Sequence, residues 1–321
     1  MNIRKLSELC GVSVCTVSRV LSGRAGEFRI TAATARKVLD AAAAAGYRPN
    51  YLSQSMNTGR THTLGVVFAN TVDLFLGSIL EGVEAVLRGT PFRPLVETCE
   101  NSLALQDEAI RQMQYREVDG ILLYPQALPP GSAYRLPEPR HRRKSFIPVV
   151  LVGRELAGWQ HDQVMMEDVA AGRQVAEEFL AAGCRRFAVI TLFSDCSSNQ
   201  SRERGFMETL RKHRVPEACR RLIRPDAPEP GDAEFLARAD ALFGINTGLL
   251  TAVLTGLRRT RDLRELRLAS IGRFEAEPLL DLNWRTLPVP GRRLGEEGAR
   301  TLLWRLDAPG RPARQLRVPL A

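Results

Sequence analysis

The stretch Leu9–Gly23, LCGVSVCTVSRVLSG, lies close to the start of the chain and carries the signals of two short helices joined by a turn. Gly11 breaks the first helix, and Ser13 is a good N-cap for the second. The second helix has its apolar side at Val17, Val20 and Leu21. Val14 and Cys15 do not belong to that side, so two apolar residues are expected at the solvent-facing start of this helix.

Helical patterns flank this stretch on both sides. On its N-terminal side, the spacing predicts a helix that carries Ile3, Leu6 and Leu9 on one face. After it, a third helix is expected between Thr31, its N-cap, and Gly46, its left-handed end. The apolar residues of this third helix are Val38, Leu39 and the alanines 41–45. Three short helices with glycine in the first turn predict a helix-turn-helix head over residues 1–48.

The formal net charge of +9 is concentrated at the N-terminal end of the chain. Residues 1–60 hold nine Lys/Arg and three Asp/Glu, which gives +6, whereas the remainder of the 321 residues adds only +3. A small basic head on a nearly balanced body indicates an anionic partner for the head.

From Thr63 onward, short apolar runs alternate with segments of helical period. The strand-like runs are 63–69, 94–99, 118–125, 148–153, 186–193, 240–246 and 267–272, and the helical segments are 74–88, 103–116, 168–183, 201–213, 247–259 and 291–306. This alternation predicts an α/β body with parallel sheets covered by helices on both faces. About ten strands in roughly 260 residues fit two doubly wound sheets better than one.

Several classes of protein are disfavoured by the sequence. The N-terminus lacks the apolar core of a secretory signal, and no run approaches the ~18 apolar residues of a membrane span. The six cysteines show no CxxC pair or metal-ligand spacing, and the four histidines are dispersed. We therefore expect reduced thiols in a cytoplasmic protein with no metal, no other cofactor and no membrane partner. Without a nucleophile or an acid–base set, we expect no enzyme activity.

In a helix-turn-helix, the first residues of the second helix meet base edges in the major groove. Here these residues are Val14, Cys15 and Thr16, and small or apolar side chains can contact the thymine methyl group. One turn further along, Ser18 can hydrogen-bond a phosphate, and Arg19 can bind a guanine or a phosphate. The competing interpretation is that Val14 and Cys15 pack against a neighbouring helix.

The strings LSELCGVSVCTVSRVLSG and GYRPNYLSQSMNTGRTHTLGVVF resemble the lactose-repressor family of bacterial transcription regulators. The resemblance is most specific over residues 3–67 and looser beyond. It implies a linker at residues 49–61 that folds into a hinge helix on double-stranded operator DNA and enters the minor groove. Met56 matches the leucine that wedges into the central base step, Gln54 replaces the usual arginine, and Asn50 is assigned to the DNA contact with them. Met56 could instead pack the two hinge helices of a dimer together.

The same resemblance implies that residues 62–321 form an effector-binding and dimerisation domain with the periplasmic sugar-binding fold. The first subdomain is expected at about 62–155 and 290–308, and the second at about 156–289 and 309–321. A ligand would bind between them at the ends of the parallel strands. A homodimer or tetramer would then read a pseudo-palindromic operator.

The resemblance assigns three residues to the effector, Phe75, Arg202 and Asn246, and the positive charge of Arg273 makes it a fourth candidate. Arg202 belongs to the motif RxxGF, with Gly205 and Phe206. The alternative interpretations are that Arg202 is a solvated helix charge and that Phe75 is part of the core. The family's carboxylates are missing at three places, where this chain has Gly153 followed by Arg154, Thr247, and the turn Gly272–Glu275.

A pocket that is short of carboxylates and rich in arginine suits an anionic ligand, because arginine matches the oxygens of phosphate and carboxylate groups. The strings GRAGEFRIT and ALPPGSAYR resemble the fructose-repressor branch, also called the catabolite repressor/activator, which implies a phosphorylated sugar such as fructose 1-phosphate.

We therefore expect a ligand-modulated DNA-binding regulator, a repressor of carbohydrate-related genes. Two alternatives stay open: a regulator whose pocket has lost its effector, and a cytoplasmic sugar-binding module or enzyme on the same body.

Overall fold

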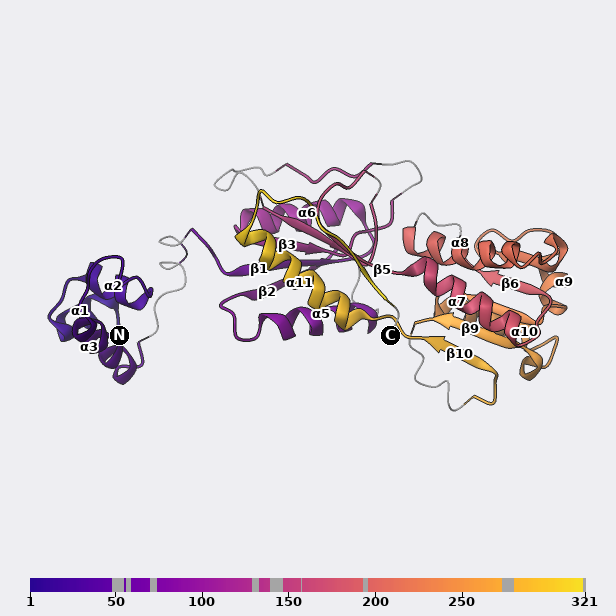
Figure 1. The fold of residues 1–321 in the computed structure, drawn as a ribbon, viewed down its shortest axis with the longest axis horizontal. Helices are drawn as coiled ribbons and strands as arrows, with labels where there is room; N and C mark the ends of the chain where they lie inside the picture. The colour runs from indigo at the N-terminus through magenta and orange to yellow at the C-terminus, as the bar shows by residue number, and fades with distance from the viewer. Residues whose placement is uncertain are drawn as a thin grey trace. The chain divides into compact units, whose positions relative to one another are not determined.

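The computed structural model of this chain describes residues 1–47, 55, 59–69, 74–128, 133–138, 147–156, 158–192, 196–272 and 280–319. Its contacts divide the chain into two compact units, Met1–Thr63 and Leu64–Ala321, which we call the head and the body (Figure 1). The body begins at the first strand that the sequence predicts.

The head consists of three helices, α1 (Ile3–Cys10), α2 (Val14–Leu21) and α3 (Ala32–Ala44). The amide of Thr16 donates to the Oγ of Ser13 at 3.1 Å, which is the predicted N-cap of α2. The amide of Thr34 donates in the same way to the Oγ1 of Thr31 at 3.2 Å and caps α3. The buried core draws on all three helices and contains Leu6, Cys10, Val17, Val20, Val38 and Ala42.

Two residues that the sequence places on apolar helix faces lie at the surface of the head. Leu9 is 63% exposed and Leu39 is 50% exposed. Cys10 takes the core position in α1, because it lies four residues after Leu6 and therefore on the same side of the helix. A buried free cysteine behaves as a small hydrophobic residue, which a search for leucine and isoleucine spacing overlooks.

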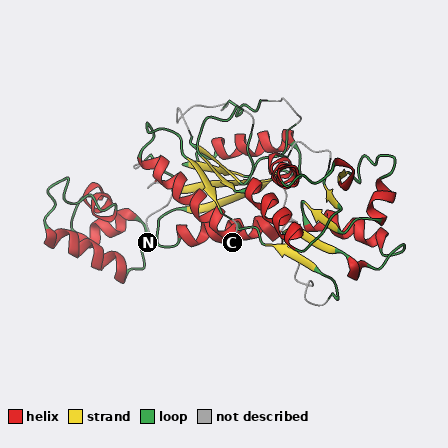
Figure 2. Ribbon diagram, turned by 45° about the vertical axis from the view of Figure 1, so that its right-hand side comes forward, coloured by secondary structure: helices red, strands yellow, loops and turns green. Residues whose placement is uncertain are grey.

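The first sheet of the body has six strands in the order β11-β5-β4-β3-β1-β2. The strands are β1 (Thr63–Phe68), β2 (Arg93–Thr98), β3 (Gly120–Leu123), β4 (Val149–Val152), β5 (Gln163–Met166) and β11 (Gln315–Val318). Three helices belong to it, α5 (Leu74–Leu87), α6 (Leu103–Tyr115) and α11 (Gly291–Asp307). β3 and β4 are buried along their whole length, as expected for strands covered on both faces. Figure 2 shows helices on both sides of the strands of the body.

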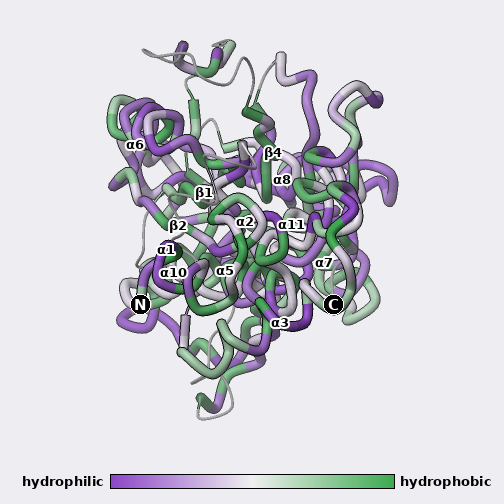
Figure 3. Tube along the Cα trace, turned by 90° about the vertical axis from the view of Figure 1, so that its left-hand side faces the viewer, coloured by the Kyte–Doolittle hydropathy of each residue, from purple (hydrophilic) through white to green (hydrophobic). Residues whose placement is uncertain are grey.

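The second sheet has five parallel strands in the order β10-β9-β8-β6-β7. They are β6 (Phe187–Ile190), β7 (Arg220–Ile223), β8 (Ala241–Gly244), β9 (Arg267–Ile271) and β10 (Trp284–Leu287), and their helices are α7 (Asp168–Ala181), α8 (Ser197–Lys212), α9 (Asp232–Ala237) and α10 (Thr247–Leu257). Along the chain, hydrophobic and hydrophilic stretches alternate, as expected for helices with one buried face (Figure 3).

The predicted fold class, a helix-turn-helix head with an α/β body of two parallel sheets, is confirmed.

The predicted boundary between the two parts of the body is wrong for two segments. Residues 156–166 and 309–321 were expected in the second subdomain, but β5 and β11 belong to the first sheet. β5 pairs with β4 through Leu151 and Gln163, and β11 pairs in parallel with β5. The second sheet is therefore an insertion between the last two strands of the first.

Glycines allow two pairs of helices in the body to pack with their backbones almost in contact. A Cβ added to Gly82 of α5 would lie 2.0 Å from the carbonyl oxygen of Arg292, and one added to Gly295 of α11 would lie 1.9 Å from that of Ile79. Helices α7 and α8 repeat this arrangement, because a Cβ on Gly172 would lie 1.9 Å from the carbonyl oxygen of Arg202. Each crossing therefore depends on the missing side chain.

Replacement of Gly82 by alanine should destabilise the body by at least about 2 kcal/mol, because the added methyl group meets backbone that cannot move aside. Gly77 provides a matched control in the same helix, since a Cβ there would have no neighbour within 4 Å. Gly77→Ala should leave the stability unchanged or raise it by up to about 1 kcal/mol. Urea unfolding of both variants measures the difference, and equal midpoints would contradict the close crossing.

Candidate nucleic-acid interface and ligand site

The first turns of α2 present an exposed face that the head core does not use. Val14 is 38% exposed, Cys15 and Arg19 are also exposed, and Ser18 is half-buried. Successive residues are 100° apart around a helix, so these four positions share one side of α2. Val17 and Val20 point the other way into the core. Val14 and Cys15 are thus not packed into the head.

Two further contacts organise this face. The hydroxyls of Ser13 and Thr16 lie 2.9 Å apart and are hydrogen-bonded, so the third predicted base-reading residue is engaged at the helix cap. The guanidinium of Arg19 lies over the ring of Phe28, with Cζ 3.8 Å from the ring centroid. The predicted linker residues Asn50, Gln54 and Met56 lie outside the described residues.

The carboxyl ends of β3 and β4 bring together an aromatic cluster in the body. The rings of Phe75 and Tyr124 meet edge to face, with centroids 5.8 Å apart. Gly153 follows β4 with φ +77°, and a Cβ there would lie 2.8 Å from Cε2 of Tyr124. Arg154 stacks on the same ring, 4.5 Å from its centroid, and donates to the carbonyl oxygen of Pro125 at 3.2 Å. The ring of Tyr124 therefore occupies the space that the Cβ of a larger residue at position 153 would need.

The second sheet contributes a buried ion pair. Arg202 of α8 donates through Nε to Oδ1 of Asp168 at 2.7 Å, and their side chains are 12% and 8% exposed. A second nitrogen of Arg202 donates to the carbonyl oxygen of Ile245 at 2.9 Å, directly before Asn246. Asn246 itself caps α10, because its Oδ1 accepts from the amide of Leu249 at 2.9 Å. Arg202 is therefore a fixed, partnered group rather than a solvated helix charge.

The first turn of α8 connects these two groups of residues. The hydroxyl of Ser198 donates to the carbonyl oxygen of Gly153 at 3.0 Å, and the amide of Glu155 donates to the hydroxyl of Ser197 at 2.9 Å. The strand ends of the two sheets are thus in direct contact through the turn after β4. Predicted residues Phe75, Arg202 and Asn246 all belong to this region, whereas Arg273 lies outside the described residues.

Three residues of this region were not singled out in the sequence: Tyr124, Asp168 and Ser198. Tyr124 directly follows the apolar run GILL, and Asp168 lies two residues after QVMM. Their position at the carboxyl ends of buried strands was the signal that could have identified them. The strand that precedes Asp168 was not predicted from the sequence, so Asp168 was not predicted to lie at a strand end.

The electrostatics of the ion pair limit what Arg202 offers to a ligand. Burial raises the pKa of Asp168 above its ordinary value, and the guanidinium of Arg202 opposes this rise. An anion that binds Arg202 would have to share the guanidinium with this carboxylate. Arg154, stacked on Tyr124, is a second guanidinium in the same region.

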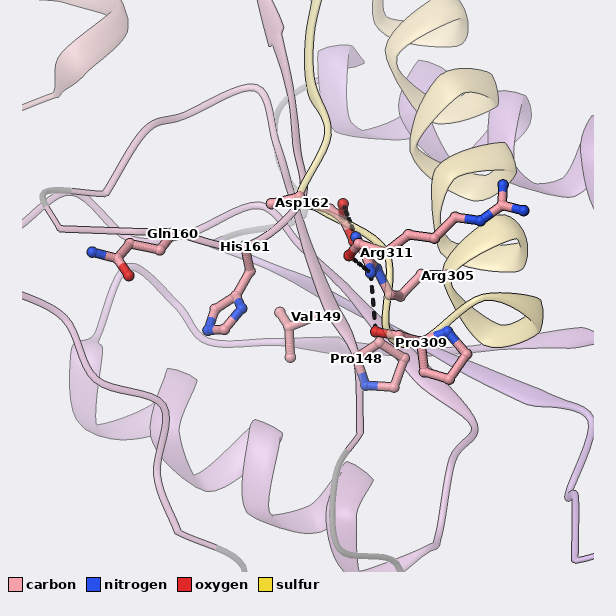
Figure 4. A pocket seen from close by; sticks show the side chains of 9 residues that line it. Pro148, Val149, Gln160, His161, Asp162, Arg305, Pro309 and Arg311 are labelled. Carbon is pink, nitrogen blue, oxygen red and sulfur yellow. Dashed lines mark hydrogen bonds and ion pairs between the residues drawn. The ribbon is translucent and has the colours of Figure 1, made fainter.

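A separate cavity of about 250 Å³ lies at the opposite, amino ends of β4, β5 and β11 (Figure 4). Its central feature is Arg305, which binds both oxygens of Asp162 at 2.6 and 2.8 Å. Arg305 also donates to the carbonyl oxygens of Pro309 at 3.1 Å and Pro312 at 2.9 Å, and the amide of Arg314 donates to Asp162 at 2.7 Å. These bonds hold the turn between α11 and β11, which gives the buried pair a structural role.

Neither a metal centre nor a membrane span is found in the part of the chain that the structure describes. No group of three or more His, Cys, Asp or Glu side chains there could hold a metal ion. No helix among the described residues is long and apolar enough to cross a bilayer.

Two family models match this chain. Residues 2–50 match the model described as bacterial regulatory proteins, lacI family, and residues 176–321 match a periplasmic binding protein-like domain. The HTH-type transcriptional regulator PtxS of Pseudomonas plecoglossicida is 26% identical over 324 residues, which cover 98% of this chain and 92% of the relative.

Two solved structures extend the likeness to the fold. The lac repressor dimer bound to operator and the anti-inducer ONPF has a TM-score of 0.76 at 15% identity, covering 100% of this chain and 97% of that one. The Cra transcriptional dual regulator from Pseudomonas putida in complex with fructose 1-phosphate has a TM-score of 0.64 at 19% identity, covering 81% and 97%. The matches confirm the resemblance predicted from residues 3–67.

Replacement of Arg202 by alanine should lower the free energy of unfolding by about 3 kcal/mol, because Asp168 would be left as an unpaired buried charge. The double variant Arg202→Ala/Asp168→Asn should recover part of this loss. Arg300→Ala breaks two partly exposed pairs, with Glu296 and Glu297, and should cost less than about 1 kcal/mol. Urea unfolding compares them, and an Arg202→Ala variant as stable as the wild type would contradict the buried pair.

Proposed function

The chain belongs to the lacI family of bacterial regulatory proteins and is a DNA-binding transcription regulator, and we propose that its head reads operator DNA through the exposed face of α2. Val14, Cys15 and Thr16 would meet base edges in the major groove, with Ser18 and Arg19 one turn further along. Asn50, Gln54 and Met56 would follow into the minor groove, where Met56 acts as a wedge. We propose that the chain represses carbohydrate-related genes.

The observation that carries this proposal is the division of α2 into two faces. Burying Val17 and Val20 while exposing Val14 and Cys15 leaves apolar groups at the end of the helix that enters a major groove. Exposed apolar side chains of this size match thymine methyl groups. The +6 charge of residues 1–60 supplies the phosphate attraction that positions such a head.

The body would bind a small effector at the strand ends where Phe75, Arg202 and Asn246 lie, with Arg273 completing the site. Position 153 has no carboxylate, and Tyr124 fills the space beside it, which favours an anionic ligand over a neutral sugar. Arg154 joins the proposed ligand set because it stacks on Tyr124 at this edge. A solved structural neighbour, the Cra regulator, holds fructose 1-phosphate. We propose a phosphorylated sugar as the effector class.

The coupling between effector and operator would be a shift between two arrangements of the body. A ligand changes operator affinity only if it binds one arrangement more tightly than the other. The hydrogen bonds from Ser198 and to Ser197 join the two sheets at the proposed site, so a ligand there would act on the joint directly. We propose a cytoplasmic homodimer or tetramer with no catalytic role.

Val14→Ala and Cys15→Ala should each change which base is preferred at one operator position, because they remove a contact to a base edge. Ser18→Ala should weaken binding about equally on all sequences, since a phosphate contact carries no sequence information. Binding-site selection on each variant decides this, with Leu39→Ala, an exposed residue of α3, as the control. Unchanged base preferences in both α2 variants would remove Val14 and Cys15 from the reading face.

Fructose 1-phosphate or fructose 1,6-bisphosphate should bind the full chain and alter its operator affinity, whereas fructose and sucrose should not. The reason is that positions 153 and 247 lack carboxylates while Arg154 and Arg273 add positive charge, so the binding energy would come from the phosphate group. Isothermal titration calorimetry with the four compounds measures this, and Arg154→Gln should weaken only the phosphorylated ones. Binding of neutral sugars alone would contradict the anion assignment, and binding of none would favour a pocket that has lost its effector.

A further inference from the structure

The loop between α2 and α3, residues 22–31, carries an exposed aromatic residue, Phe28, whose ring contacts two arginines. The Cζ of Arg19 lies 3.8 Å from the ring centroid of Phe28, and that of Arg24 lies 5.1 Å away. Arg24 is paired with Glu27, whose Oε2 lies 2.8 Å from the Nε of Arg24. The closer contact of the ring is thus with the arginine of α2, and the more distant arginine already has an acidic partner.

The loop is anchored so that Phe28 stays at the surface. The amide of Ile30 donates to the carbonyl oxygen of Ala25 at 3.0 Å, and Arg29 adopts a left-handed φ of +53°. Ala25 and Ile30 pack against the head core. Among the described residues of the head, Phe28 is not one of the side chains packed on that core, and it is 38% exposed. The ring of Phe28 therefore packs on the guanidinium of Arg19 and not on the core of the head.

We propose that Phe28 is a positioning residue that holds the Arg19 guanidinium ready to contact DNA, which makes the α2–α3 loop part of the reading surface. Stacking occupies the flat face of a guanidinium and leaves its N–H edge available. That edge is the part of arginine that donates in pairs to O6 and N7 of guanine. A long side chain fixed in this way loses less conformational freedom on binding. The inference rests on the proposed DNA-reading role of α2.

A double-mutant cycle on the full chain tests this coupling, using the operator obtained by binding-site selection. Phe28→Leu should weaken operator binding about two- to five-fold, the range of an exposed cation–π contact. Phe28→Tyr keeps the ring and should restore wild-type affinity. In an Arg19→Ala background, Phe28→Leu should cause no further loss, because the group that it positions is absent.

Base preference provides a readout that a merely structural role would not change. Phe28→Leu should relax selection only at the operator position that Arg19→Ala also relaxes. Arg24→Gln, at the more distant arginine, should leave selection at that position intact. Thermal unfolding checks that each variant keeps the wild-type fold.

The outcomes separate this inference from the proposed function. A wild-type chain that selects no DNA sequence overturns both. A wild type that selects an operator, with Phe28→Leu binding it as tightly or weakening it equally in the Arg19→Ala background, overturns the role of Phe28 alone.

Discussion

The close approach of α7 and α8 is the constraint on which the ligand region of the body depends. Gly172 lies one turn after Asp168, and its missing side chain makes room for the carbonyl oxygen of Arg202. Gly205 repeats the fit against Val169 from the other helix. These two glycines set the distance between the helices, and the buried pair of Arg202 and Asp168 forms at the end of that crossing. The position of the arginine is therefore decided by backbone packing before any ligand arrives.

In the head, a small core has to satisfy two demands at once. Three short helices must bury enough apolar surface to be stable, and the start of α2 must keep apolar groups in water. The side chains of Val17 and Val20 meet the first demand, and Val14 and Cys15 serve the second. The N-cap at Ser13 allows both, because it fixes where α2 begins and hence which residues turn outward. A shift of one residue in this start would rotate the reading face by about 100°.

The sequence predicted the three helices of the head, most helices of the body, the two-sheet body and the exposed start of α2, because these follow from periodicity and capping. It did not predict the short helix α9 or the first turn of α8. It did not predict the short strands β5, β7, β10 and β11. Three of these four lie at the edges of their sheets, where one side faces water and the apolar run is broken. The fourth, β5, lies inside its sheet but has only four residues, so its apolar run is short. The partner of Arg202 was missed with it, since Asp168 follows β5. Contacts such as Arg19 with Phe28 depend on how a loop folds back, which no local pattern contains.

The insertion of the second sheet between β5 and β11 has a consequence for the order in which the chain is made. Strands β6 to β10 form a continuous segment, so their sheet can be completed while synthesis is still in progress. The first sheet is incomplete until α11 and β11 have been made, because both follow the second sheet in the chain. Until then β5 has an open edge, and α5 lacks the helix that covers Gly82. The buried bond between Asp162 and Arg305 joins residues 143 positions apart, so it can form only after the whole second sheet and α11 have been made.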